Sequence, residues 1–481
     1  MGPVNTSEGR FAPGAIWTIV VLMATASLMS LNETVLGVAL KTLREDLELP
    51  LTSIQWVVSV FPLTMAVVVP TTGYLLVRFT ERQVFFAATA LFATGALACA
   101  LSPGFMVLVG GRVLQAAGTA LTMPLLMTTV MRLVPSTHRG SVIGMITVVT
   151  AVAPALGPTV GGIVLDSLGW RWLFWLALPL MAKVITIGAI KFRPGHTPSA
   201  TPLDVLSVPL AALGFGGLLY GLSTIGEDAE GTVTTPTVTA VLVGVGALAG
   251  FIARQVRLQR SGRALLDLGV LTHRRFAVAV GIVALLFTCM MAVTSVLLPL
   301  YLQTMLARST TVSGLVMLPG GLAMGLLGPL VGRLYDRFGA RVLVLPGAGL
   351  TTVALGLFAS LGAETQLWRV VMTHLLLMAG VGTMMTPLNT YALSSLPDHL
   401  YSHGSAILTT IQQVAGAFGI ALFATIATLA SANSEVATDV TGFRAAFTIM
   451  AVIGVAALAL ALLVDRPADP HARTDHGRPG R

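Results

Sequence analysis

The sequence predicts an all-α integral membrane protein with fourteen transmembrane helices. Of its 481 residues, 55% are hydrophobic and only 10% are charged, whereas soluble domains carry about 25% charged residues. The chain also divides into long apolar runs, and the Lys and Arg residues between them gather on one side. Because a water-soluble fold needs a wetted surface, this composition excludes a soluble enzyme, a nucleic-acid-binding protein and a disordered chain.

Fourteen apolar runs are separated by polar or Gly/Pro breaks. Each run is close to the roughly 20 residues that a membrane-spanning helix needs. We expect helices because lipid offers no hydrogen-bond partner to the backbone. The runs lie at 15–38, 54–76, 84–101, 105–131, 141–164, 172–190, 205–223, 237–253, 277–302, 313–331, 342–361, 368–393, 404–430 and 444–464.

The distribution of basic residues predicts the orientation of these helices. If the N-terminus is cytoplasmic, 20 of the 28 Lys and Arg residues fall in inner segments and six in outer segments or helix edges, with Arg112 and Lys183 inside runs. Cytoplasmic loops carry such an excess of basic residues. We therefore expect a multi-pass protein of the cell membrane with both termini in the cytoplasm, and we attribute the net charge of +8 to orientation.

An internal repeat predicts two related halves. The segments Gly73–Arg82 and Gly332–Arg341 superimpose at Gly, at Arg-Phe and at the final Arg with an offset of 259 residues. Transporter folds are built from such repeats. The copy recurs eight helices later instead of six, so runs seven and eight are inserted. We divide the chain into a cytoplasmic N-terminus (1–14), an N-terminal six-helix bundle (15–192), two linker helices (203–254), a C-terminal six-helix bundle (276–464) and a disordered cytoplasmic tail (465–481).

The repeated segment resembles a signature of the major facilitator superfamily, G-x-L-x-D-R-x-G-R-K. The C-terminal copy matches it at Gly332, Asp336, Arg337, Gly339 and Arg341. The N-terminal copy retains Gly73, Arg78 and Arg82 but has Val77 in place of Asp and Thr80 in place of Gly. The resemblance implies a major facilitator fold with gating loops at these residues. If relatives use that aspartate in an inner gate, other residues must take its role here, and Arg78, Glu81 and Arg82 are the candidates.

Other motifs follow in the order of the drug:proton antiporter branch of this superfamily, which has fourteen spans. Arg112-Val-Leu-Gln115 resembles its fourth-helix R-x-x-Q-G motif. Gly157-Pro158-Thr-Val-Gly161-Gly162 resembles the antiporter motif G-P-x-x-G-G. Leu31-Asn32-Glu33-Thr34 resembles the first helix of lincomycin-resistance efflux pumps, with the acidic residue one position later than in many relatives.

The twenty acidic residues include one, Glu33, that lies well inside an apolar run. A carboxylate in lipid is costly and usually functional, and desolvation favours its protonated form. At 1.5 Å per residue, Glu33 lies about 12 Å from the outer end of its helix and Arg112 about 10 Å. We expect the two to form a proton-coupling site, with a static structural ion pair as the alternative.

Several polar residues inside other runs are candidates for binding a substrate or lining a lumen: Asn32, Gln115, Asn389, Gln412 and Gln413. For each, hydrogen bonding between helices is the alternative. His374 is interpreted as a core histidine with satisfied nitrogens, in preference to a pH-sensitive group. Gly157, Pro158, Gly161 and Gly162 allow close helix packing, and the resemblance adds a role in antiport.

The predicted function is export of drugs or antibiotics driven by the proton gradient. The chain has no Gly-Lys dipeptide and hence no Walker A loop. We expect no enzymatic activity, no metal and no cofactor besides H⁺ as coupling ion. The expected partners are a small-molecule drug, protons and membrane lipid, without nucleic acid, and the expected state is a monomer. Proton-coupled export of an endogenous metabolite and a transport-inactive membrane sensor are the alternatives.

Overall fold

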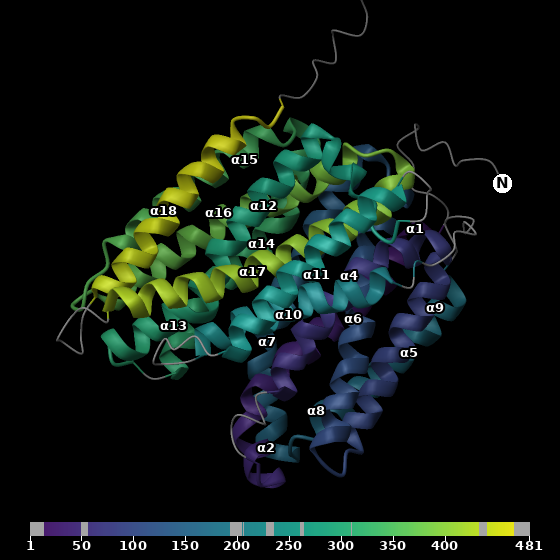
Figure 1. The fold of residues 1–481 in the computed structure, drawn as a ribbon, viewed down its shortest axis with the longest axis horizontal. Coiled ribbons are helices and arrows are strands. Elements are labelled where there is room, and N and C mark those ends of the chain that lie inside the picture. Colours follow the sequence, from purple (N-terminus) through teal and green to yellow (C-terminus); the bar gives the residue numbers. More distant parts are fainter. Residues whose placement is uncertain are drawn as a thin grey trace, which may run out of the picture.

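The computed structural model of the chain describes residues 14–49, 56–192, 204, 206–227, 235–259, 264–308, 310–431 and 440–465. Within these ranges every regular element is a helix, which confirms the all-α prediction. Figure 1 shows two bundles, one of purple and blue N-terminal helices and one of green and yellow C-terminal helices.

Each predicted apolar run forms the core of one helical stretch. The N-terminal stretches are α1 (Ala15–Val35), α4 (Trp56–Arg78), α5 (Glu81–Ala100), α6 (Phe105–Leu133), α7 (Arg139–Leu168) and α8 with α9 (Trp172–Trp175 and Ala177–Lys191). Three short elements complete this part: η2 (Leu36–Ala39), α2 (Leu40–Leu47) and η3 (Ser136–His138). Most of these helices extend a few residues past the apolar runs, because polar residues at a span end can lie in water.

The middle and C-terminal stretches follow the same rule. They are α10 (Ser207–Glu227), α11 (Thr235–Gln259), α12 (Arg274–Ala292), α14 (Thr310–Phe338), α15 (Arg341–Ala359), α16 (Leu367–Ser394), α17 (Tyr401–Ser431) and α18 (Thr441–Ala461), with short turns η4 (Leu268–Thr272) and η7 (Asp398–Leu400). The span of α12 continues through two π-helical turns, η5 (Val293–Leu297) and η6 (Tyr301–Met305), on either side of α13 (Leu298–Leu300).

Eleven helices in the described ranges are long and apolar enough to cross a membrane. Three further long helices, α7, α10 and α17, correspond to the other predicted runs. The count of fourteen transmembrane helices therefore stays a prediction, while the multi-span character of the chain is clear.

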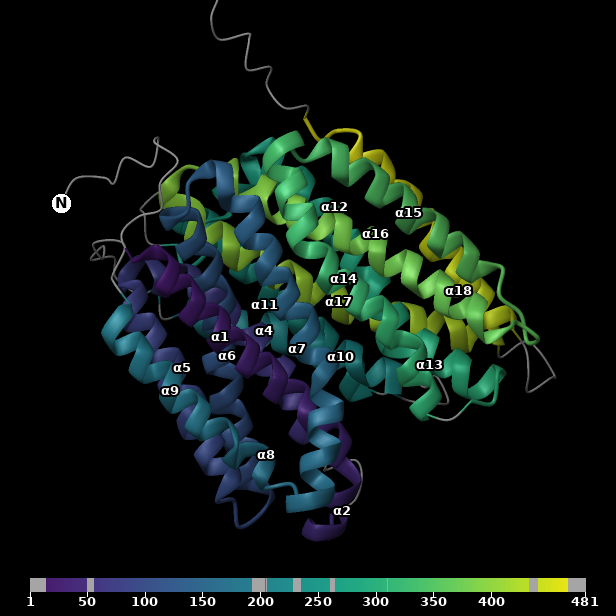
Figure 2. The ribbon, with the colours of Figure 1, turned by 180° about the vertical axis from the view of Figure 1, so that it is seen from behind.

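The first helix begins and the last helix ends at the same end of the molecule, which we call the terminal end. Lys191, which ends α9, lies over the ring of Trp17 in the first turn of α1. At the C-terminal bundle, Arg341 at the start of α15 donates to the carbonyl of Val464 just after α18. Figures 1 and 2 show α2 and α13 far apart, toward the opposite end of the two bundles.

The two bundles contact each other mainly through α7 against α14 and α4 against α17. The repeat makes these two pairs equivalent, because the offset of 259 residues carries α4 onto α14 and α7 onto α17. A cavity that lies between the bundles is therefore surrounded by elements related by the repeat.

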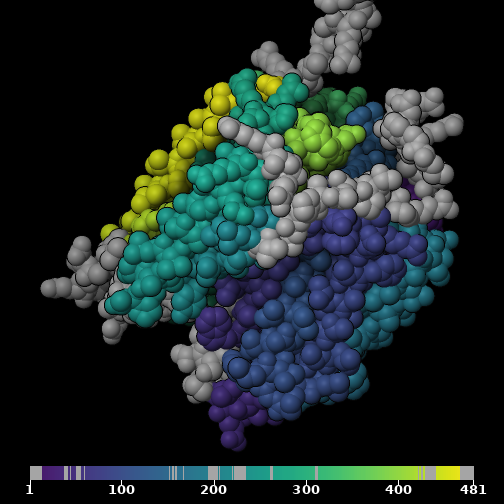
Figure 3. All heavy atoms as spheres, turned by 45° about the vertical axis from the view of Figure 1, so that its right-hand side comes forward, coloured from purple at the N-terminus to yellow at the C-terminus, as the bar shows by residue number. Residues whose placement is uncertain are grey.

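The two inserted helices, α10 and α11, pack on each other, and α10 also packs on α4 and α17. In the space-filling view the middle of the chain, in teal, lies between the purple and blue atoms and the yellow ones (Figure 3). Asp204, just before α10, accepts two hydrogen bonds from Arg254 of α11, at 2.7 and 2.6 Å. These bonds lower the pKa of Asp204 to about 2, so the pair remains charged at neutral pH and ties the two helices together.

Candidate functional site

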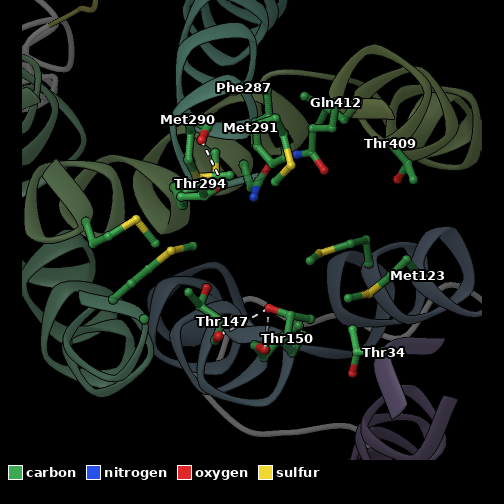
Figure 4. Close-up of a pocket in the computed structure, with 18 of the residues that line it drawn as sticks. Thr34, Met123, Thr147, Thr150, Phe287, Met290, Met291, Thr294, Thr409 and Gln412 are labelled. Carbon is green, nitrogen blue, oxygen red and sulfur yellow. Dashed lines mark hydrogen bonds between the residues drawn. The ribbon is translucent and has the colours of Figure 1, made fainter. Parts of the chain in front are cut away.

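A cavity of about 690 Å³ lies between the two bundles. Figure 4 shows Thr34, Met123, Thr147 and Thr150 of the N-terminal bundle on one side and a set of C-terminal residues on the other. The labelled C-terminal residues are Phe287, Met290, Met291, Thr294, Thr409 and Gln412. Such a volume suits a drug-sized molecule.

Methionine is the commonest residue on the cavity wall. Eight methionines line it, contributed by four helices on both sides: Met123, Met127, Met290, Met291, Met317, Met324, Met378 and Met385. Among the described lining residues there is no Asp, Glu, Lys or Arg. Methionine side chains are flexible and polarisable, so this wall can adapt to apolar bodies of different shape.

Helical spacing brings the lining residues to one face of each helix. On α16 the lining residues His374, Met378, Met385 and Asn389 are separated by four, seven and four positions. On α17 the lining residues Ser405, Leu408, Thr409 and Gln412 follow a similar pattern. Residues three, four and seven apart share a helix face. The π-helical turn η5 carries the lining residue Thr294.

The predicted polar residues of the C-terminal bundle divide between cavity and interface. Asn389 and Gln412 line the cavity. Gln413 points its Nε2 at the Met65 sulfur of α4, at 3.9 Å, and so lies at the contact between α17 and α4. The substrate-binding assignment of Gln413 stays a prediction, and the structure places it at the interface between bundles.

Arg112, Gln115 and Asn32 form one buried hydrogen-bonded chain in the N-terminal bundle. Arg112 Nη1 donates to Gln115 Oε1 at 3.2 Å, and Gln115 Nε2 donates to Asn32 Oδ1 at 2.9 Å. Asn32 Nδ2 then donates to the carbonyl of Leu173 at 3.2 Å. This hydrogen-bonded series joins α6, α1 and α8. Its polar groups would be costly to bury unpaired, and here they serve as hydrogen-bond partners for one another.

The guanidinium of Arg112 is fully buried and is held on two further sides. Its Nε donates to the Val57 carbonyl at 3.3 Å, and its charge lies 4.3 Å from the centroid of the Phe61 ring. Its Nη2 has no hydrogen-bond partner within the described residues. An unpaired buried donor is costly, so this atom is a ready site for an additional acceptor.

Glu33 follows Asn32 of the polar chain and precedes Thr34 of the cavity wall on α1. Successive residues of a helix point about 100° apart, so Asn32 faces the polar chain while Thr34 lines the cavity. Glu33 is half-buried as a residue, and its side chain is near enough to Arg112 for opposite charges on the two to attract each other. Within the described residues the two make no direct ion pair of 4 Å or less. The structure thus brings the two predicted residues together without joining them.

The predicted antiporter motif packs on the same part of α1. A Cβ atom on Gly157 would collide with the hydroxyl of Thr34, so glycine at this position permits the close approach of α7 to α1. Gly161 is buried, and Gly162 has open space around its Cα. Pro158 lies in α7, but its side chain is outside the described residues.

Asp336 closes the contact between the bundles at the terminal end. Its two carboxylate oxygens accept hydrogen bonds from the backbone N–H groups of Gly140 and Ser141, both at 2.8 Å, and from the Ser141 hydroxyl. The acceptor charge sits at the N-terminus of α7, where the helix dipole favours it. A Cβ atom on Gly140 would lie 2.7 Å from the carbonyl of Gly332, so small residues let the backbones touch here.

Replacing Asp336 by Asn should open the terminal end. The amide keeps one acceptor but loses the charge, and a hydrogen bond to a charged group contributes about 1.5–3 kcal/mol. We expect a cysteine placed at Thr147 in the cavity, with Cys99 and Cys289 replaced by Ala, to react about tenfold faster with an impermeant thiol reagent applied at the terminal end. The exposed Asp398, substituted by Asn, is the control. Equal labelling in both variants would show that Asp336 does not hold this end closed.

The N-terminal copy of the loop closes the equivalent contact with other residues. Gly73 packs against His403 at the start of α17. Where the equivalent of Asp336 would be, the chain has Val77, and the contact across to α17 comes from Arg132, which Glu81 of the same bundle holds in an ion pair. The carboxylate of Glu81 is buried and pairs with Arg132 at 2.7 Å, and Arg132 Nη2 donates to the Ser402 hydroxyl at 3.4 Å. Glu81 was among the predicted substitutes for the missing aspartate.

The other loop residues stay within their own bundles. Arg82 donates to the Ala189 carbonyl at 3.0 Å, and Arg341 donates to the Val464 carbonyl at 3.2 Å. Arg337 lies over the Phe338 ring, and Arg78 ends α4. Gly339 ends α14 with φ +78°, a conformation that favours glycine.

Sequence reasoning missed two features of the site. The grouping of the methionines could not be seen, because their positions in the chain are scattered over more than 250 residues. The interpretation of His374 as a satisfied core histidine is wrong, because neither ring nitrogen has a hydrogen-bond partner in the described part of the chain. Its place in an apolar run was the available signal.

Two bundles related by a repeat, around one central cavity, define a membrane transporter of the kind that exposes its site to each side in turn. The profile of the Major Facilitator Superfamily matches residues 22–420. The chain belongs to the major facilitator superfamily.

Named relatives and a solved structure support this assignment. The chain is 38% identical over 396 residues to "Lincomycin resistance protein LmrB" of Listeria monocytogenes, covering 82% of this chain and 83% of that protein. The protein of the same name from Bacillus subtilis is 33% identical over 410 residues, covering 85% and 84%. The crystal structure of the human organic anion transporter MFSD10 superimposes with a TM-score of 0.65 at 16% identity, covering 94% of this chain and 100% of that one.

Proposed function

We propose that this protein exports drugs or antibiotics across the cell membrane in exchange for protons. The names of its relatives refer to resistance to lincomycin and to multiple drugs. The central cavity has the volume and the apolar, adaptable wall that such substrates need. The expected monomer, without a cofactor, remains part of this proposal.

The observation that carries proton coupling is the position of Glu33. Its carboxylate interacts with the buried charge of Arg112, and the next residue, Thr34, lines the cavity. When Glu33 is deprotonated, it is attracted to Arg112, whose Nη2 lacks a partner. When Glu33 takes up a proton, that attraction is lost. Because α1 packs on Gly157 through Thr34, a shift of α1 is transmitted to α7 and to the cavity wall.

The direction of transport follows from the orientation that we propose. The excess of basic residues supports a cytoplasmic location of the terminal end. The contacts of Asp336 and of Arg132 close that end. The bundles diverge toward the other end (Figures 1 and 2), so this conformation faces outward and is the one in which an exporter releases substrate and takes up protons.

A susceptibility panel in an efflux-deficient bacterial host tests the proposed function. Cells that produce the protein should tolerate higher concentrations of some compounds than cells with the empty vector, and lincosamides should be included. Unchanged tolerance to the whole panel, with the protein present in the membrane, would favour export of an endogenous metabolite or a sensor without transport.

Introducing the missing aspartate at Val77 should slow export. The repeat places residue 77 where Asp336 lies in the other copy, and Gly73 of the same helix already contacts the start of α17. A carboxylate there would cap α17 as Asp336 caps α7, and a second lock would make opening toward the cytoplasm rarer. We expect initial rates to fall several-fold in Val77→Asp and to stay close to wild type in Val77→Asn. Unchanged rates in Val77→Asp would mean that this contact does not limit transport.

A further inference from the structure

His374 is a polar side chain that the fold leaves unpaired in the cavity. It lies on α16, is 1% exposed and lines the cavity between the bundles. Neither Nδ1 nor Nε2 has a hydrogen-bond partner among the described residues. A neutral imidazole has one N–H donor and one nitrogen acceptor, so both groups are available to a molecule in the cavity.

The position of the imidazole is built into the neighbouring helix. Gly320 of α14 lies directly against it, and a Cβ atom at Gly320 would overlap the His374 ring. The same added atom would lie 2.9 Å from the Met378 side chain. The absence of a side chain at Gly320 therefore gives the ring its space.

Most other hydrogen-bonding groups of the wall are already engaged. The hydroxyls of Thr150, Thr294 and Thr409 each donate to a backbone carbonyl of their own helix. The remaining polar groups include the half-buried amides of Asn389 and Gln412. Burying a polar group without a hydrogen bond is costly in proteins. A substrate that hydrogen-bonds to His374 would offset the cost of burying the imidazole. A leucine at this position would have no such cost, and it would also offer the substrate no hydrogen bond.

The wall also limits the charge of the substrate. The described lining residues include no Asp or Glu that could balance a cation and no Lys or Arg that could balance an anion. Transferring an unpaired charge into such an environment is far more costly than transferring a neutral polar group. The methionines can contact an apolar body, but they supply no counter-ion.

We propose that His374 determines specificity by hydrogen-bonding a polar group of an amphiphilic substrate that is uncharged when bound. A weak base would enter this site as its free base, and a permanent cation of the same shape would be excluded. This inference rests on the proposed function, since it assumes that the cavity receives the exported compound.

Equilibrium binding to the purified protein in lipid nanodiscs tests the inference. The probes are a tertiary-amine compound that the susceptibility panel shows to be exported, with lincomycin as first choice, and its N-methyl quaternary derivative. We expect His374→Leu to weaken binding of the tertiary amine about five- to tenfold, because a neutral hydrogen bond contributes about 1 kcal/mol. His374→Gln should retain most of the affinity. The quaternary derivative should bind at least tenfold more weakly than the tertiary amine.

Two further variants separate a binding role from a structural one. Thr373→Val is the matched control, because Thr373 is the buried neighbour of His374, bonds the Arg369 carbonyl and is not a lining residue. Gly320→Ala should displace the imidazole and weaken binding, with no additional loss when combined with His374→Leu.

Unchanged binding in His374→Leu, or equal loss in the Leu and Gln variants, would overturn the role of His374. Equal binding of the two probes would overturn the restriction to uncharged substrates. Failure of the wild-type protein to export any compound would instead contradict the proposed function.

Discussion

Substituting Glu33 by Gln should abolish export driven by a proton gradient while leaving substrate exchange intact. Glutamine has nearly the same shape and fills the same place beside Arg112, but it cannot take up and release a proton. In proteoliposomes with an imposed pH gradient, uptake or efflux of substrate should fall to the level of liposomes without protein. Counterflow, in which labelled and unlabelled substrate exchange without a gradient, should continue, because it needs the cavity and the conformational change but no net proton movement.

Glu33→Asp supplies the control for this prediction. It keeps a titratable group one methylene shorter, so we expect a reduced but measurable response to the gradient. If Glu33→Gln still concentrates substrate against a gradient, Glu33 is not the proton site. If both counterflow and driven transport are lost although the protein is folded in the membrane, the carboxylate has a structural role, as in the alternative of a static pair.

Arg112→Ala should impair transport more severely than Arg112→Lys. The alanine variant loses the charge near Glu33, the bonds to Val57 and Gln115, and the contact with Phe61. Lysine keeps the charge but, as a point donor on a flexible stem, cannot reproduce the fork of the guanidinium. If hydrogen bonds to a charged group contribute about 1.5–3 kcal/mol, the rate should fall about ten- to hundredfold in Arg112→Ala, with the lysine variant in between.

Lys183→Ala is the matched control for Arg112, because Lys183 is the other basic residue inside an apolar run and is exposed on α9. Its substitution should leave the transport rate close to that of wild type. Initial rates should be compared at equal amounts of folded protein in the membrane. Equal losses in Arg112→Ala and Arg112→Lys would mean that the shape of the guanidinium matters and its charge does not.

The helices of this protein could be predicted almost completely from the sequence. Each apolar run forms a helical stretch, and the ends differ by only a few residues, because the bilayer requires every spanning segment to satisfy its own backbone. The helix α14 reaches furthest beyond its predicted run, at the end where Asp336 contacts α7 of the other bundle. This helix end is longer than its hydrophobicity indicates, because its polar side chains are stabilised by contacts with the other bundle and not by lipid.

The candidate site was predictable only in part. Glu33 and Arg112 stood out because charge is rare inside apolar runs, and simple depth arithmetic placed them at one level. Gln115 carried a weaker signal, since a polar amide in a span can face a substrate or another helix. The structure resolves its contacts: Gln115 lies between Arg112 and Asn32. The sequence could not show whether the ring nitrogens of His374 have hydrogen-bond partners. That depends on the residues packed around the ring, including Gly320 of another helix, α14.

The sequence by itself determined that this is a two-fold repeated, multi-helical membrane protein, and it singled out one carboxylate, that of Glu33, well inside an apolar run. Those properties follow from the solvent, since lipid acts on each segment separately through its length, its hydrophobicity and its few charges. Only the tertiary structure decided which polar groups meet, that eight methionines from both bundles line one cavity, and that Asp336 caps a helix of the other bundle. Such pairings depend on the rotation and crossing of helices that are far apart in the chain, and local composition carries no record of them.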